Sequence, residues 1–376
     1  MKKLFFMAVA ASVAFAACVK NEPVLQENQK AISFAAPVVG TATKATTEIS
    51  NNFPEDVKFA VWAHYFDDAV DGGVYTEFSA GQVYMDDVTV GFDGEYDGWA
   101  SVSYYYWPKN GSLTFSAYSP AGVDATLGAS GICFDDYVVS TTAADQVDLL
   151  FSERAYDKTA IDDNEQENGT TSPDPTFTAD LYRGVHLTFN HALSSVLFSV
   201  YVGDFPGHKI VLKKIELTNI YSKGDFNQGL TDANGKTTTA NADLWTNEAD
   251  EKTYTITVNQ ELEVGIPYWP CLDEITNTAP QASNGKRATD WLLLPQEIAE
   301  DAQMIVTYTL QSPDSEPLEQ VIPVKLSDPS NQLNVDEWKW GHRYHYNIVI
   351  NLDEIYFEPY VVDWDNGTGS DYYVYF

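Results

Sequence analysis

The sequence predicts an all-β protein built from two β-sandwich domains in tandem. Apolar and polar residues alternate in many short runs, which is the period of a strand with one buried face. Turn segments rich in glycine, proline and asparagine separate these runs, and helical periodicity is almost absent. Aromatic residues make up 14% of the chain, which suits strands with large cross-strand contacts. Many short strands without intervening helices favour sandwiches over a βαβ fold.

Each predicted strand is a run in which alternate side chains are apolar. The first run comprises Ile32, Phe34, Ala36 and Val38, and later runs cover 57–63, 113–117, 196–202, 254–258, 304–310 and 344–352. Residues 355–364 form a further extended segment, the turn DNGTGS follows, and the aromatic sequence DYYVYF ends the chain as another strand candidate. Most domains end in a frayed polar tail, so this aromatic end is expected to be buried by something.

The length of 376 residues suits two domains better than one. A polar, acidic stretch from about Tyr156 to Asp180 has almost no aliphatic residues and is predicted to be a loop or linker. The predicted division is a signal peptide at 1–18, a tether and first strand at 19–44, sandwiches at 45–183 and 184–354, and a C-terminal appendage at 355–376.

Residues 1–18 have the features of a bacterial lipoprotein signal. Lys2 and Lys3 precede an apolar run from Leu4 to Phe15, and Ala16-Ala17-Cys18 follows. A positive start, a short apolar core and small residues before a cleavage site describe a secretory signal, and this core is too short to span a bilayer. The cysteine resembles that of a lipobox, so Cys18 is the expected lipidation site. A plain secretory signal with a chance cysteine is the alternative.

The formal net charge of −34 argues against two classes of partner. Nucleic acid and anionic membrane surfaces would both be repelled, so no nucleic-acid binding is expected. Beyond Cys18 only Cys133 and Cys271 remain, without the spacing of a zinc site. Each is expected to be a small buried residue rather than half of a disulfide.

No catalytic signature is present, and we expect neither enzymatic activity nor a cofactor. HExxH, Walker, GxSxG and helix-opening GxGxxG motifs are absent, and no carboxylate pair stands out for glycoside hydrolysis. His342 and His345 are expected to be exposed strand residues rather than metal ligands, and His191 to make a local hydrogen bond. The acidic residues at 93–98 and 162–167 offer calcium ligands, but solvated loops are the favoured interpretation.

Five segments, in order, resemble the Bacteroidales fimbrillin family, the Mfa-like lipoproteins that form type V pili. They are YYWPKNGSLTFSAYSP (105–120), VDLLFS (147–152), LTFNHALSSVLFSV (187–200), LLLPQ (292–296) and WKWGHRYHYNIVINLDEIYFEPYVVDW (338–364). The lipobox and TATKA (41–45) also fall where the family would place them. The resemblance implies a transthyretin-like β-sandwich for each domain, and it favours core packing for Tyr104–Trp107 over a sugar-stacking platform.

The resemblance also implies a route of assembly. A trypsin-like protease would cut between Lys44 and Ala45 and remove the lipidated segment that carries the first strand, Ile32 to Val38. The C-terminal segment of a neighbouring subunit would then fill the groove. The matching donor residues are Tyr360, Val362, Trp364, Tyr372, Val374 and Phe376. Lysine stands here where the family's protease takes arginine.

The first strand also fits this role on physical grounds. A sandwich that lacks one strand exposes an apolar groove and unpaired backbone groups, a template for strand addition. Burial of the alternating side chains of 32–38 contributes roughly 5–10 kcal/mol gross, so an intact precursor would be held closed. The alternative is that this strand is permanent in a monomeric protein.

The function predicted from these features is that of a structural subunit, a stalk pilin, of a surface fimbria for adhesion or biofilm formation. Its partners would be other fimbrial subunits, the processing protease, the outer membrane through the precursor's lipid, and a host or glycan ligand. A tip or anchor subunit, and a monomeric carbohydrate-binding surface lipoprotein, are the alternatives.

Overall fold

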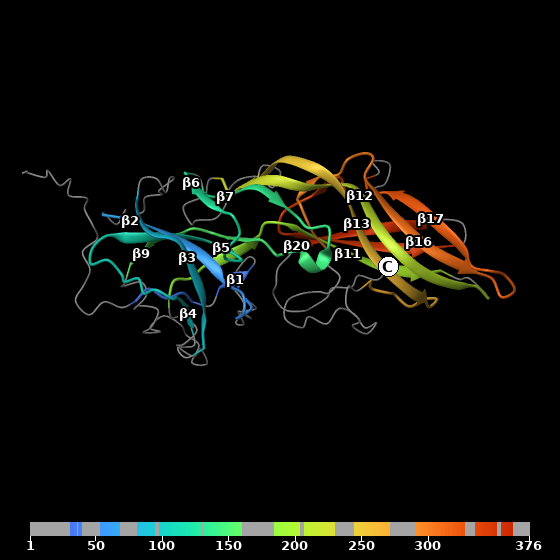
Figure 1. Ribbon diagram of the computed structural model, residues 1–376, viewed down its shortest axis with the longest axis horizontal. Coiled ribbons are helices and arrows are strands. Elements are labelled where there is room, and N and C mark those ends of the chain that lie inside the picture. Colours follow the sequence, from blue (N-terminus) through green and yellow to red (C-terminus); the bar gives the residue numbers. More distant parts are fainter. Residues whose placement is uncertain are drawn as a thin grey trace, which may run out of the picture.

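The protein is described by a computed structural model. Described residues are 31–35, 37–39, 53–67, 81–94, 98–129, 131–159, 184–203, 207–229, 244–270, 291–327, 335–351 and 355–363. Within these ranges the chain is all-β (Figure 1), apart from a 3₁₀ turn at Ala143–Asp145, and this confirms the predicted all-β class. No helix among the described residues is long and apolar enough to cross a membrane.

The first sheet has eight strands in the order β1-β10-β8-β5-β2-β3-β4, with β9 beside β5. These strands are β1 (Val38–Val39), β2 (Phe59–Phe66), β3 (Gln82–Asp93), β4 (Gly98–Ser101), β5 (Ser112–Ser119), β8 (Leu150–Ser152), β9 (Ala155–Lys158) and β10 (Thr188–His191). Every residue of β2 and β5 is buried, because both strands are central and covered on both faces. All neighbours are antiparallel except β1 and β10, which run parallel.

The other strands form three further sheets. A four-stranded sheet has the order β14 (Trp291–Leu293), β11 (Ser194–Val202), β19 (His342–Ile350) and β20 (Ile355–Asp363). A six-stranded sheet has the order β17 (Leu318–Lys325), β16 (Gln303–Gln311), β12 (Lys209–Asn227), β7 (Gly131–Val138) and β6 (Thr126–Gly128), with β13 (Trp245–Leu262) also on β12. Strands β15 (Gln296–Glu297) and β18 (Glu337–Trp338) pair with each other.

The long strand β12 joins the two halves of the chain. Its residues 209–218 pair with β16, whereas 223–227 pair with β7 from the N-terminal half. Strand β13 pairs along the other side of β12 over most of its length. Figure 1 shows β6 and β7 at the end of the β12–β13 pair, next to the first sheet. One sheet therefore contains strands from both predicted domains.

The sheets do not follow the division expected at residue 184. Strand β10 lies beyond that point but pairs with β8 in the first sheet, and β11 then begins the four-stranded sheet. The change of sheet falls at Ala192–Leu193. The acidic stretch was a poor guide to the boundary because the chain returns to the first sheet after it.

The apolar core is also continuous across the halves. One buried cluster joins Trp62, Tyr118 and Phe151 of the first sheet to residues of β11, β12, β13 and β19. The Phe151 ring lies 5.0 Å from that of Phe226 on β12 and 5.6 Å from that of Trp340. A second cluster fills the rest of the N-terminal half, around Phe59 and Phe115.

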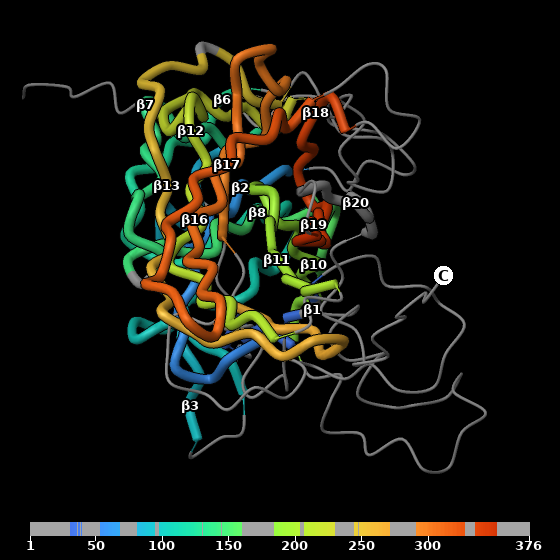
Figure 2. The backbone as a smooth tube through the Cα atoms, turned by 90° about the vertical axis from the view of Figure 1, so that its right-hand side faces the viewer, coloured from blue at the N-terminus to red at the C-terminus, as the bar shows by residue number. Residues whose placement is uncertain are grey.

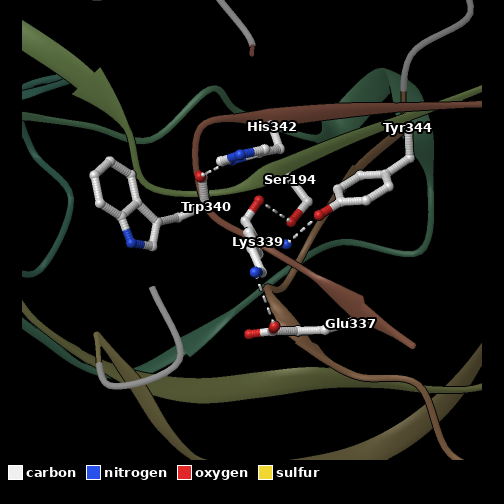
Figure 3. Close-up of polar contacts among 6 residues, drawn as sticks. All are labelled: Ser194, Glu337, Lys339, Trp340, His342 and Tyr344. Carbon is white, nitrogen blue, oxygen red and sulfur yellow. Dashed lines mark hydrogen bonds and ion pairs between the residues drawn. The ribbon is translucent and has the colours of Figure 1, made fainter. Parts of the chain in front are cut away.

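A turn between β18 and β19 secures the point where the chain passes from β10 to β11 (Figure 3). Ser194 Oγ donates to the Lys339 carbonyl at 2.9 Å, and the Lys339 N–H donates to Tyr344 Oη at 2.7 Å. Gly341, with φ +65°, donates its N–H to the Leu193 carbonyl at 3.0 Å. The WKWGHRY sequence thus builds the joint between the two halves.

Replacement of Phe151 with alanine should destabilise the whole molecule. Removal of a fully buried ring that packs on both halves is expected to lower the free energy of unfolding by about 3–5 kcal/mol. Urea unfolding followed by fluorescence and by circular dichroism should show one coincident transition, shifted to lower urea. The control V102A, at a 95% exposed side chain, should leave the curve unchanged. Two separate transitions, only one of them shifted by F151A, would contradict a shared core.

Candidate functional site

The N-terminal segment 31–39, of which residues 31–35 and 37–39 are described, lies between the two ends of the first sheet. On one side it meets β4 and the chain that follows it. The Ile32 N–H donates to the Tyr105 carbonyl at 2.7 Å, and the Phe34 N–H donates to the Trp99 carbonyl of β4 at 2.9 Å. These contacts are antiparallel bridges. The segment therefore supplies partners to the β4 end of the sheet.

On its other side the same segment pairs with the chain that leads into β10. The Ala35 N–H donates to the Val185 carbonyl at 3.0 Å, and the Val185 N–H donates to the Ser33 carbonyl at 2.8 Å. The parallel ladder continues through β1, with Val38 opposite Thr188 and Val39 opposite Phe189. Figure 2 shows β1 next to β10. Because residues 31–39 pair with both ends, they close the sheet on itself.

Side chains of this segment belong to the N-terminal core. Ile32 and Phe34 are buried, as predicted, and Ala35 is buried too. The Phe34 ring meets Phe59 and Phe115 edge to face, with centroids 5.7 and 5.8 Å away. Ile32 and Phe34 together contribute roughly 3–6 kcal/mol gross. Burial of Ala35 was not predicted, because the alternation rule assumes one buried face and this segment is covered on both.

Gly184 permits the close approach of the segment to the chain before β10. Its φ is +110°, and a Cβ at this position would lie 2.7 Å from the Ser33 carbonyl oxygen and 2.7 Å from the Phe34 carbonyl carbon. Any other residue would push on the segment's backbone and would also strain its own. Sequence reasoning missed this residue, since a glycine beside a polar stretch looks like an ordinary turn residue.

The aromatic run at 104–107 alternates between the core and the surface. Trp107 is 2% exposed and Tyr105 packs against the core, whereas Tyr104 is 64% and Tyr106 38% exposed. The expectation that all four pack in the core was therefore wrong for Tyr104 and Tyr106. Period-two alternation in an extended segment is the signal that could have shown this. Beneath the run, Tyr84 Oη donates to the Tyr106 carbonyl, and burial, then the nearby Tyr105, raises the Tyr84 pKa.

Most of the predicted maturation residues lie outside the described residues. This applies to Cys18, Lys44, Ala45 and Ala36, and to Trp364, Tyr372, Val374 and Phe376 of the expected donor. Val38 is described by its backbone alone, as part of β1. The expected cleavage point follows the end of β1 by five residues.

Strand β20 contains the first part of the expected donor. It pairs antiparallel with β19 at the edge of the four-stranded sheet, from His342 opposite Asp363 to Ile350 opposite Ile355. Tyr360 lies opposite His345 and Val362 opposite Arg343. The extended conformation predicted for this segment is present. In this conformation its backbone pairs with β19 of the same chain.

The histidines have more specific surroundings than the sequence indicated. His191 is buried, and its Nδ1 lies 2.9 Å from Asp148 Oδ1, a partner 43 positions away rather than a local one. His345 and His342 are half-buried, not exposed. His345 Nε2 lies 2.8 Å from Ser199 Oγ, its ring stacks on Trp269, and His342 Nδ1 lies 2.9 Å from the Trp340 carbonyl.

The remaining candidates have structural positions. In the first calcium candidate Asp93 and Gly98 pair at the ends of β3 and β4, and residues 95–97 lie outside the described residues. The second, at 162–167, lies outside the described residues, as does Cys271. Cys133 is half-buried, and burial raises the pKa of its thiol. Within the described ranges no three His, Cys, Asp or Glu side chains are placed to hold a metal ion.

Fold and site together define an all-β protein whose N-terminal segment pairs with both ends of its own first sheet. The chain belongs to the fimbrillin-like family, whose model matches residues 43–364. This confirms the resemblance noted in the sequence. No curated protein matches the sequence significantly.

Fimbrial proteins are among the solved structures that this chain resembles. One is a fimbrial protein from Bacteroides vulgatus ATCC 8482, with a TM-score of 0.51 and 15% identity, over 89% of this chain and 99% of that one. Another is the tip fimbrial protein Mfa3 from Porphyromonas gingivalis with a C-terminal truncation, with a TM-score of 0.31 and 13% identity, over 82% of this chain and 95% of that one. At such identities the likeness to the first structure supports the fold alone.

Substitution of Gly184 with alanine should loosen the N-terminal segment. We compare it with G122A. Gly122 also has a positive φ, +93°, but a Cβ at that position would have no neighbouring atom within 4 Å. In both variants backbone strain should lower the free energy of unfolding by about 1–2 kcal/mol. G184A alone should speed hydrogen exchange at the amides of Ile32, Phe34 and Ala35, by about tenfold or more. Equal exchange rates in the two variants would show that the close approach at Gly184 does not hold the segment.

Proposed function

We propose that the protein is a subunit of a surface fimbria, made as a lipoprotein precursor and assembled by exchange of its N-terminal strand. The precursor would be lipidated at Cys18 and reach the outer membrane. Cleavage between Lys44 and Ala45 would release the segment that contains Ile32, Phe34, Ala36 and Val38. A stalk role fits best, because a stalk subunit both accepts and donates a strand.

One observation carries the proposal: residues 31–39 pair with both ends of the first sheet. Their loss would leave the Trp99 and Tyr105 carbonyls and the Val185 N–H without these partners. It would also empty the space that Phe34 fills between Phe59 and Phe115. Unpaired backbone beside an apolar groove is a template for an added strand. While the segment is in place, it competes with any incoming strand.

The C-terminal segment 355–376 is the proposed donor. Tyr360, Val362, Trp364, Tyr372, Val374 and Phe376 would supply its alternating side chains. Because β20 pairs with β19 in the free chain, donation of Tyr360 and Val362 would replace one set of backbone hydrogen bonds with another. Such an exchange is close to balanced in hydrogen bonds, so burial in the groove would decide its direction.

The residue at the N-terminus of assembled material tests this route. Mass spectrometry of high-molecular-weight protein sheared from producing cells should find Ala45 first. K44A should leave the chain as a lipidated monomer, because the competing strand stays attached. The control K30A removes a lysine ahead of the strand and should assemble normally. Lipidated Cys18 at the start of a purely monomeric wild-type chain would contradict the stalk role and favour an anchor subunit.

A monomeric carbohydrate-binding lipoprotein is the second candidate, and the exposed rings of Tyr104 and Tyr106 favour it. Aromatic faces on a surface can stack on sugar rings. If this is the function, the chain should bind a glycan array, and Y104A/Y106A should lose most of the signal. The control is V102A, at a neighbouring exposed position. Array binding without any assembly on cells would favour this candidate over a fimbrial subunit.

A further inference from the structure

A cavity of about 280 Å³ lies beside β9 and β10 on the first sheet. His186 and Thr188 alternate along the chain with Val185, Leu187 and Phe189, which pack in the core, so the first two face away from it. Figure 1 shows β9 among the strands of this sheet. The cavity is lined by Glu153, Arg154, Ala155, Tyr156, Lys158, His186 and Thr188.

The charge of this lining is opposite to that of the chain as a whole. Arg154 and Lys158 are cationic, His186 can take up a proton, and Glu153 is the one carboxylate in the lining. The whole chain, in contrast, has a formal net charge of −34. Its field repels polyanions, so the cavity suits a small ligand with a single negative group that fits inside.

Arg154 is fixed in the wall of the cavity. Its side chain is only 2% exposed, and its Nη1 donates to Tyr156 Oη at 3.4 Å. Burial lowers the pKa of the guanidinium, and Tyr156 opposes this shift. A guanidinium already removed from water loses little further solvation when an anion arrives, so the site is organised for binding in advance.

We propose that this cavity binds a hexuronate, a sugar whose one negative group is a carboxylate. The planar fork of Arg154 matches a carboxylate, and Lys158 adds a second positive charge. The hydroxyls of Tyr156 and Thr188 and the carboxylate of Glu153 can hydrogen-bond to sugar hydroxyls. The volume suits one sugar ring, at the small end of ligand cavities. This binding does not depend on strand exchange.

Titration of the exported chain with D-glucuronate, followed by calorimetry, tests the site, with D-glucose as the neutral analogue. Glucuronate should bind and glucose should not, because only the former carries the carboxylate. K158Q should weaken binding by about tenfold, as expected for loss of one charged hydrogen bond. R154Q should abolish binding. Because R154Q removes a buried side chain, its folding is checked first, and K158Q, at a half-buried position, is the decisive variant.

The matched control is V102A, which alters a fully exposed side chain outside the cavity lining and should leave the affinity unchanged. Equal affinity for glucuronate and glucose would overturn the proposal. Unaltered affinity in K158Q would overturn it as well, as would loss of binding in Y104A, which would place the sugar on the tyrosines. If sodium acetate binds to the site as tightly as glucuronate does, the site recognises an anion and not a sugar, and the proposal is wrong.

Discussion

The fold of the N-terminal half depends on the pairing of residues 31–39 with both ends of the first sheet. A sheet normally leaves two edges unpaired, and each edge is a site for unwanted association. Here one segment satisfies both edges and fills the core between them with Phe34. Gly184 makes this possible, because the backbones approach too closely for a Cβ. A single cut downstream would therefore leave the segment that completes the sheet attached by noncovalent contacts alone.

The second constraint is the long β12–β13 pair, which prevents the two halves from behaving independently. Strand β12 pairs first with β16 and then with β7, and Phe226 near its end packs on Phe151 of the first sheet. Such continuity matters for a filament subunit, because a tensile load on one end must pass through the chain to the other. Two sandwiches joined by a flexible linker would instead extend at the linker under load.

Alternating patterns predicted β16 and β19 well, because a strand with one buried face has apolar residues at every second position. The same patterns could not predict partners. Nothing in residues 209–227 specifies that one strand changes partner along its length, since pairing is decided by backbone groups common to all residues. The acidic stretch suggested a boundary that the sheets ignore, and the role of Gly184 depends on a tertiary approach with no local signature. The cavity at Arg154 was also not predicted, because its lining comes from two segments, 153–158 and 186–188, that are far apart in the sequence.

The most direct test of the closing role of residues 31–39 uses a chain that begins at Ala45 together with a synthetic peptide of residues 31–39. Hydrogen exchange at Val185, whose N–H donates to Ser33, reports occupancy of the groove. We expect little protection and a low unfolding temperature without the peptide, and recovery of both when it is added. A peptide with F34A should restore neither. Full protection and unchanged stability without any peptide would contradict the account, because the sheet would then close without its N-terminal strand.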